Sequence, residues 1–435
     1  MTPLQIIAFL LVICASGAYI NQRFTKLPPP LAMTFLGLAT AVSLQIAQLL
    51  GLVDIDQVEH LLRQIDFPNL LLHGLLGFML FAGALSVDFN SLKKWAIPVA
   101  NLAIVGVLVS AFATGGLLWL ITQAISMDLP FIWCLLFGSI IASTDPIAAL
   151  SIVSRAGAPR HLKVKLVGES LFNDGTSIML YLVILGVIAT GEVHVLHLGY
   201  ELFVAPLGGA LLGAVVAWIA TLAIAKIDHH PTELLVTVAL AAGVYGLAEA
   251  LTVSAPIAAV AAGLVVGHVA RNKAMSQESR EHIDSFWESM DEILNTALFA
   301  LIGLELLLID LSTELLYTGL AVWVAVLIAR WLGVLGALGR KRKTFGKGAT
   351  TILVWGGMRG GISLALALSV PASPQAQIIV ALTFVVVTAS SVVQGMTLGR
   401  VIKRAIHQPG PEQADDLDAE NNDETLADDK PHRTI

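Results

Sequence analysis

Charged side chains are scarce in this chain: they make up 13% of its 435 residues, whereas a soluble domain carries about 25%. Hydrophobic residues make up 56%, and the mean hydropathy is +0.80. The only cysteines, Cys14 and Cys134, fall in separate apolar segments, which disfavours a disulfide or a cysteine metal site. No GxGxxG motif follows a predicted strand, so we expect no dinucleotide-binding domain and no cofactor. This composition indicates an all-α polytopic membrane protein.

Apolar windows of about 20 residues predict about thirteen transmembrane helices. They cover roughly residues 3–21, 30–50, 69–87, 95–124, 130–153, 164–190, 199–226, 232–251, 254–270, 288–309, 316–338, 349–370 and 376–401. We expect two six-helix repeats, about 3–190 and 232–401, joined by a linking helix at about 199–226. Because the repeats begin seven spans apart, an odd number, they are inverted relative to one another.

Basic residues are nearly missing from one set of the loops between these spans. That set contains Arg63 alone, whereas the other set contains runs such as 340–343. By the positive-inside rule, we expect the N-terminus outside and the C-terminus in the cytoplasm, with the protein in a bacterial inner membrane. Residues 409–435 contain nine acids and two basic residues, so we expect a disordered tail after a membrane domain at 1–408.

Two histidine pairs lie in predicted loops. His194 and His197 form an HxxH sequence in an outward loop, and His229 and His230 are adjacent in an inward loop. Neither pair by itself brings enough ligands for a metal site. Either could titrate near neutrality, but surface histidines without a special role are far more common.

Two spans carry helix-breaking residues near their middle. The span at 130–153 contains Ser143-Thr144-Asp145-Pro146, and the span at 349–370 contains the sequence GGMRGG at 356–361. Interrupted backbone is tolerated at membrane depth only where it lines a cavity. Each interrupted span is the fifth of its repeat, and matched interruptions in inverted repeats are typical of the substrate site of a secondary transporter. We therefore expect two broken helices that cross each other. Glycines that only allow tight helix packing are the simpler alternative, but they would not explain the positional match.

Acidic residues inside apolar spans point to the chemistry. Asp145 and Asp174 lie in the fifth and sixth spans. An ionised carboxylate near the bilayer centre costs about 2.5–3.5 kcal/mol. Such residues usually serve to move an ion or a proton, so we expect these two aspartates to do so.

Asp174 is the carboxylate for which we expect a proton and a metal cation to compete. Ser170 lies four residues earlier, on the same helix face, and Thr144 comes from the interrupted span. We predict a Na⁺ site at Asp174, Ser170 and Thr144, because Na⁺ and Li⁺ need oxygen ligands. Asp145 acts there through water or through its field. Asn173 stands where a second acid would add a titrating charge, which favours electroneutral one-for-one exchange.

Other residues near the breaks are expected to be structural. A buried Glu169 without a counter-charge would be costly, since a buried charge that loses its partner destabilises a protein by about 3–5 kcal/mol. We therefore predict that Glu169 forms an ion pair with Arg359, which lies in the interrupted span. Pro146, Gly357 and Gly360 provide the helix breaks and the spacing.

Three more charged residues leave alternatives open. Asp88 is a weaker candidate for ion or proton binding, because it falls near the cytoplasmic end of its span, where a solvated helix-end role is favoured. Glu305 and Arg330 lie in apolar spans, where a packed ion pair and a direct transport role are equally plausible.

The motifs STDP (143–146), GESLFND (168–174) and GGMRGG (356–361) occur in this order, and together they resemble the monovalent cation/proton antiporter-1 family. FAGALSVDF (81–89) and FALIGLEL (299–306) are weaker matches. The resemblance covers the membrane body but not the tail. It implies a thirteen-helix fold with a core domain, a dimer-forming domain and an elevator-like movement. It also implies that Asp174 binds the ion and the proton, with Thr144, Asp145 and Ser170 around the ion, whereas Asn173, Glu169 and Arg359 match structural positions.

Cation/proton exchange is therefore the predicted function, and we do not expect an enzyme. The expected substrates are H⁺ and Na⁺, Li⁺ or K⁺, and the expected partners are membrane lipid and a second copy of the chain, without nucleic acid. An intramembrane aspartyl protease using Asp145 and Asp174 is the alternative. Such a dyad shares one proton between its two acids, but the chain lacks a GxGD sequence, and a protease would need neither Arg359 nor an inverted repeat.

Overall fold

The computed structural model describes residues 3–51, 66–145, 149–150, 152–153, 156, 160–192, 198–271, 274–309, 311–339 and 348–406. The structural statements below concern these residues. The acidic tail, the HxxH sequence and Pro146 lie outside them.

Helices occur at every one of the predicted spans. The first repeat contains α1 (Pro3–Ile20), α2 (Pro29–Leu49), α4 (Phe67–Asn69) with η2 (Leu70–Leu75) and α5 (Leu76–Leu85), α7 (Ala96–Asn101) with η3 (Leu102–Gly106) and α8 (Val107–Ala124), α9 (Phe131–Ala142), and α11 (Arg160–Thr190). The short α6 (Phe89–Lys94) follows α5. The linking helix is η4 (Tyr200–Val204) with α13 (Ala205–Ile224).

The second repeat contains α14 (His230–Ala250), α15 (Ala255–Val265) with η5 (Val266–Ala270), α17 (Gln277–Leu304) with η6 (Glu305–Leu307), α18 (Thr313–Leu338), α19 (Ala349–Trp355), α20 (Gly361–Leu368), and α21 (Pro374–Ala389) with η8 (Ser390–Gln394) and α22 (Gly395–Ile406). Eight of the described helical segments are long and apolar enough to cross a membrane, and Phe131–Ala142 and Ala255–Ala270 are shorter apolar helices. The described chain is an all-α membrane protein.

Serine side chains define the beginning of three helices in the second repeat. Ser276 accepts a hydrogen bond from the backbone N–H of Ser279 at the start of α17. Ser312 and Ser373 accept the equivalent bonds at the starts of α18 and α21. Such caps satisfy backbone donors that have no partner inside the helix.

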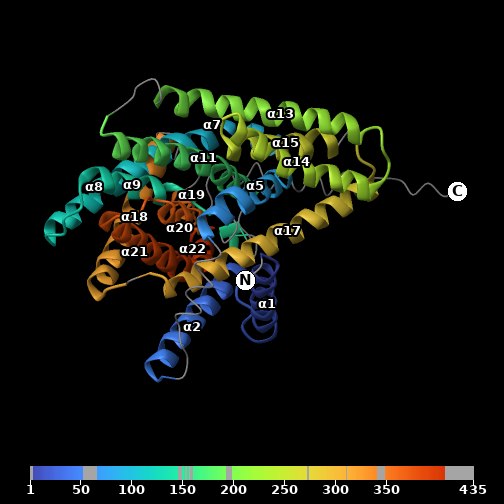
Figure 1. The fold of residues 1–435 in the computed structure, drawn as a ribbon. Helices are drawn as coiled ribbons and strands as arrows, with labels where there is room; N and C mark the ends of the chain where they lie inside the picture. Colours follow the sequence, from blue (N-terminus) through green and yellow to red (C-terminus); the bar gives the residue numbers. More distant parts are fainter. Residues whose placement is uncertain are drawn as a thin grey trace.

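Two large apolar cores divide the described part of the molecule, and a small third cluster lies at Ala41, Leu304 and Leu307. Helices α13, α14 and α15 pack against one another and against α5 along one edge, while α8, α9, α18, α20 and α21 gather on the other side (Figure 1). Phe81, Val244 and Val260 belong to the first core, and Phe137 and Leu382 to the second. Because α11 and α17 contact helices of both groups, their side chains can line a site where the two cores meet.

Candidate ion-binding site

The two interrupted spans meet at their breaks. Helix α9 ends at Ala142 and helix α19 at Trp355, and the residues that follow each of them are not helical. The backbone N–H of Asp145 donates a hydrogen bond to the carbonyl oxygen of Met358, at 2.8 Å. This bond joins the fifth spans of the two repeats, as the matched interruptions predicted.

Arg359 satisfies the carbonyl groups that the end of α9 leaves free. Its guanidinium Nη1 donates to the carbonyl oxygens of Ala142 and Ser143, both at 2.8 Å, and the residue is 2% exposed. The positive group therefore neutralises the negative end of a broken helix. Its own backbone N–H donates to Ser390 Oγ at 3.0 Å, which fixes the second break from the other side.

Close contacts explain two of the glycines in GGMRGG. A Cβ atom at Gly360 would lie 2.7 Å from Cβ of Asp145, and a Cβ atom at Gly357 would lie 2.6 Å from Nε of Arg330. Both distances are shorter than real carbon contacts allow, so only glycine fits beside these side chains. The predicted role of Gly357 and Gly360 in the helix break stays a prediction, and these contacts add a steric reason for glycine at both positions.

Asp174 lies on α11 and is 3% exposed. Ser143 Oγ donates a hydrogen bond to Asp174 Oδ1 at 2.6 Å. The backbone N–H of Ser143 in turn donates to Ser177 Oγ, at 3.1 Å. The break after α9 thus holds a hydroxyl group against the carboxylate, and Ser143 and Ser177 were not among the predicted site residues.

A second group of polar side chains links Thr144, in the break after α9, to Ser170 and Asn173 on α11. Thr144 Oγ1 and Ser170 Oγ are 3.1 Å apart, and Asn173 Nδ2 donates to Thr144 Oγ1 at 2.6 Å. All three side chains are buried. Asn173 therefore positions the threonine hydroxyl without adding a charge.

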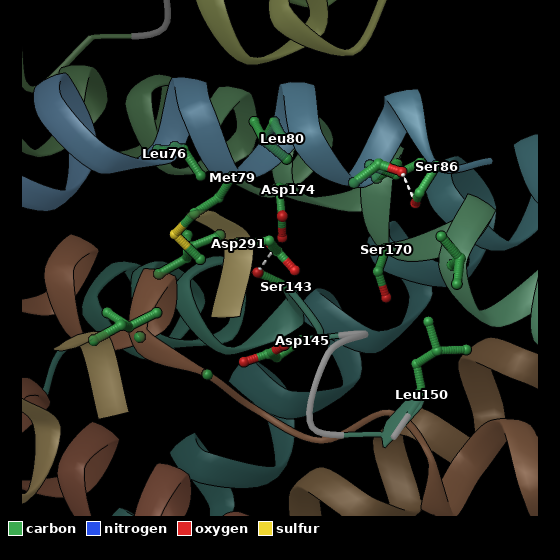
Figure 2. A pocket seen from close by; sticks show the side chains of 17 residues that line it. Leu76, Met79, Leu80, Ser86, Ser143, Asp145, Leu150, Ser170, Asp174 and Asp291 are labelled. Carbon is green, nitrogen blue, oxygen red and sulfur yellow. Dashed lines mark hydrogen bonds between the residues drawn. The ribbon is translucent and has the colours of Figure 1, made fainter. Parts of the chain in front are cut away.

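A cavity of about 90 Å³ lies beside these groups; Ser170 lines it, whereas Thr144 and Asn173 do not. Its lining includes Asp145, Asp174, Ser143, Ser170 and, from α17, Asp291, and Figure 2 shows these side chains around one space. Carboxylate, hydroxyl and carbonyl oxygens are the ligands that hard cations prefer. The cavity lining thus offers oxygen ligands for a cation together with three acids.

Asp291 was not predicted from the sequence. It falls inside the predicted span at 288–309, so the signal that identified Asp145 and Asp174, an acid in an apolar span, applies to it as well. It was overlooked because the residues before it, in the first half of α17, are also polar and charged, so one more acid does not stand out there.

The prediction that Glu169 pairs with Arg359 is wrong. Glu169 is bonded instead to Arg330: Nη2 of Arg330 donates to Glu169 Oε2 at 2.9 Å, and Nη1 donates to Oε1. Arg330 Nη2 also donates to the carbonyl oxygen of Leu353, at 3.1 Å. The bidentate pair is buried and joins α11, α18 and α19, so Glu169 and Arg330 have the structural role that was expected of Glu169 and Arg359.

Two other predicted candidates lie outside the cavity lining. Asp88 caps α6, where it accepts hydrogen bonds from the N–H of Asn90 at 3.0 Å and the hydroxyl of Ser91 at 2.7 Å. Asp88 therefore lies at a helix end, as the favoured one of its two predicted roles requires. Glu305 is buried at the start of η6 and is not among the residues that line the cavity.

A second, larger cavity of about 680 Å³ lies further along the same helices. On α11 the first cavity contacts residues 167–174 and the second contacts residues 178–185. The same order holds along α20 and the residues next to it, where 360–362 line the first cavity and 366 and 369 line the second. The two cavities therefore lie end to end, with the middle of α11 between them.

Comparison with known proteins agrees with this geometry. A family model described as "Sodium/hydrogen exchanger, transmembrane" matches residues 8–404. The Na⁺/H⁺ antiporter NhaP of Pseudomonas aeruginosa is 41% identical over 409 residues, which cover 92% of this chain and 96% of that protein. The Na⁺/H⁺ antiporter NhaH of Halobacillus dabanensis is 31% identical, over 92% of this chain and 97% of that protein.

The fold is similar to that of a solved structure, the sodium proton antiporter MjNhaP1 from Methanocaldococcus jannaschii. The TM-score is 0.73 with 23% identity, and the match covers 93% of this chain and 99% of that chain. Because the family model covers residues 8–404, the chain belongs to the transmembrane sodium/hydrogen exchanger family.

Proposed function

We propose that this protein exchanges Na⁺ for H⁺ across the membrane by letting the two ions compete for Asp174. The observation that carries the proposal is the burial of this carboxylate at the crossing of two broken helices, beside a cavity to which Ser143, Asp145 and Ser170 contribute oxygen atoms. A carboxylate there carries either a proton or a metal cation, because an unneutralised charge at membrane depth is costly. The proposed Na⁺ ligands are Asp174, Ser170 and Thr144, with Asp145 and Ser143 beside them. Li⁺ and K⁺ are further candidate substrates, since oxygen ligands suit them as well.

The proposed stoichiometry rests on Asn173. Its amide group donates to Thr144 and takes up no proton, so each transport cycle moves one charge in each direction. Exchange of one Na⁺ for one H⁺ moves no net charge across the membrane. A membrane potential should then leave the exchange rate unchanged.

The end-to-end cavities support alternating access. The first cavity extends from Asp174 toward the C-terminal end of α5, where Ser86 and Val167 line it. The second cavity begins at Ile178 of α11. Between them, Gly175 of α11 packs so closely on α15 that a Cβ atom there would lie 2.9 Å from Ile257. A shift of α11 and the two broken helices past α15 would transfer the ion from one cavity to the other. This is an elevator-like movement of one core against the other.

The molecular setting of this proposal is a bacterial inner membrane, with the N-terminus outside and the C-terminus in the cytoplasm. We further infer a homodimer in contact with lipid, a membrane domain at 1–408 and an acidic cytoplasmic tail at 409–435. The family is one of transporters and not of enzymes, so the protease alternative has no support from it.

Substitution of Asp174 in proteoliposomes tests the proposal. Asp174→Asn keeps the size of the side chain but removes the titrating and cation-binding group. We expect Na⁺-driven proton movement to fall to the level of protein-free liposomes, while Asp128→Asn, the same change at an exposed loop acid, retains it. Full exchange by the Asp174 variant would overturn the proposal. A rate that depends on an imposed potential would overturn the one-for-one stoichiometry alone.

A further inference from the structure

A cluster of three side chains lies outside the ion cavity, where α14 and α17 begin. His230 is the first residue of α14, and Glu278 and His282 lie on the first turns of α17. Nitrogen or oxygen atoms of all three lie within 4.8 Å of one another. The sequence alone indicated no metal site at His229 and His230. Glu278 and His282, which complete the cluster with His230, lie about fifty residues further along the chain.

The spacing within the cluster follows from helix geometry. Glu278 and His282 are four residues apart, so they lie on the same face of α17. The imidazole rings of His230 and His282 are stacked, with centroids 4.5 Å apart and planes at 22°. His230 is half-buried and the other two side chains are exposed, so small rotations can bring their ligand atoms closer together.

We propose that His230, Glu278 and His282 form a binding site for a divalent transition metal ion, with Zn²⁺ as the best fit. Two imidazole nitrogens and one carboxylate oxygen are a set that Zn²⁺ uses, with ligand distances of about 2.0–2.2 Å, and imidazole selects Zn²⁺ over hard cations such as Mg²⁺. Ligands of one Zn²⁺ ion lie about 3–4 Å apart at these distances. The cluster therefore needs only a modest contraction, and water can take the fourth position.

A buried carboxylate on α14 also favours a cation. Glu233 is 1% exposed and lies three residues after His230 on α14, on the same face. Its Oε1 accepts from the N–H of His229 at 3.2 Å, and its Oε2 has no hydrogen-bond partner among the described residues. Of the nearby arginines, Arg271 is bonded to Asp284, and Arg280 donates to the carbonyl oxygen of Met275.

A bound ion would link α14 to α17. Helix α17 carries Asp291 and Leu298 to the ion cavity, and the metal cluster lies at the N-terminal end of the same helix. Zn²⁺ would thus join a helix of the first core to a helix that lines the Na⁺ site. This site does not depend on Asp174 or on transport.

Zinc binding by the full-length protein, purified with a tag that contains no histidine, tests this inference. Competition with a chromophoric zinc chelator should give one bound Zn²⁺ per chain. Substitution of a ligand should weaken binding by at least about tenfold, since even the loss of an outer-shell partner has such an effect. His230→Ala, Glu278→Gln and His282→Ala should each show this loss. The double variant His194→Ala/His197→Ala, which removes two imidazoles elsewhere, should bind as the native chain does.

Direct ligation has its own spectroscopic signature. With Co²⁺ as the probe, His282→Cys should add a thiolate-to-cobalt charge-transfer band that the native chain does not have, because sulfur would then contact the metal. The protein should also unfold at a higher temperature with Zn²⁺ than without it, as expected for a ligand of the native state. Absence of stoichiometric zinc binding, or equal affinity in the native chain and the three ligand variants, would refute the proposal.

Discussion

At the scale of single residues, the pair of Glu169 and Arg330 is the interaction whose loss should be most costly. Both side chains are nearly inaccessible, at 1% and 2%, and the bidentate geometry neutralises both charges. Removing one partner leaves the other charge buried, which costs about 3–5 kcal/mol. An exposed pair contributes far less, about 0–1 kcal/mol.

Glu169→Gln should therefore lower the free energy of unfolding by about 3–5 kcal/mol, because Arg330 loses its counter-charge. Thermal unfolding in detergent measures this change. Asp284→Asn breaks the more exposed pair with Arg271 and should shift the unfolding temperature little. The double variant Glu169→Met/Arg330→Met should recover most of the loss. Equal shifts for Glu169→Gln and Asp284→Asn would show that burial does not set the strength of the Glu169–Arg330 pair.

The sequence indicated the members of the charged set but not how they pair. Glu169, Arg330 and Arg359 all stand out as charges in apolar spans, and Arg359 was the predicted partner because it lies in a break. The structure shows that the break itself occupies Arg359: two carbonyl groups at the end of α9 accept its hydrogen bonds. Partner choice between two arginines depends on the rotation of α18 about its axis, which apolar periodicity fixes poorly in a helix that is hydrophobic all round.

At the scale of helices, the breaks themselves could be predicted from the sequence. Paired glycines and an STDP sequence interrupt otherwise apolar spans, and their matched positions indicated that the two spans cross. The contact between Asp145 N–H and the Met358 carbonyl confirms that the two segments meet. The bond from the Ser143 hydroxyl to Asp174 was not predicted, although Ser143 begins the STDP sequence, because the sequence does not show which side chain of a broken segment turns toward the carboxylate.

Where the two broken helices cross, Gly360 lies so close to Asp145 that even a methyl group at this position would disturb the site. In Gly360→Ala the new methyl group would displace the carboxylate of Asp145, so Na⁺/H⁺ exchange should fall by at least about tenfold while the protein remains in the membrane. Gly246→Ala, at a helix position with no atom within 4 Å, should leave exchange unchanged, since alanine is well tolerated in a helix. Proton movement in proteoliposomes measures both. Normal exchange by Gly360→Ala would mean that the position of Asp145 is not critical.

At the scale of the whole molecule, two cavities aligned along α11 suggest that the ion site is reached from opposite sides of the membrane. Each cavity has a serine that can report on it: Ser86 lines the first and Ser254 the second. The native cysteines, Cys14 and Cys134, are 5% and 0% exposed. They should react little with a maleimide that cannot cross the membrane.

We expect Ser254→Cys to be labelled from the outside of intact cells, and Ser86→Cys only in inverted vesicles. The native chain, labelled in both preparations, is the background control. The reverse pattern would mean that the chain has the opposite orientation. Labelling of both positions from one side would contradict the separation of the two cavities by the middle of α11.

The proposed mechanism depends on one carboxylate, Asp174, for which a proton and a sodium ion compete. Calorimetric titration of the purified protein with Na⁺, repeated in buffers that differ in ionisation enthalpy, measures this exclusion directly. We expect a heat that varies with the buffer and corresponds to about one proton released for each Na⁺ bound, and no such binding by Asp174→Asn. Sodium binding with a heat independent of the buffer would mean that no proton leaves, and would contradict competition at Asp174.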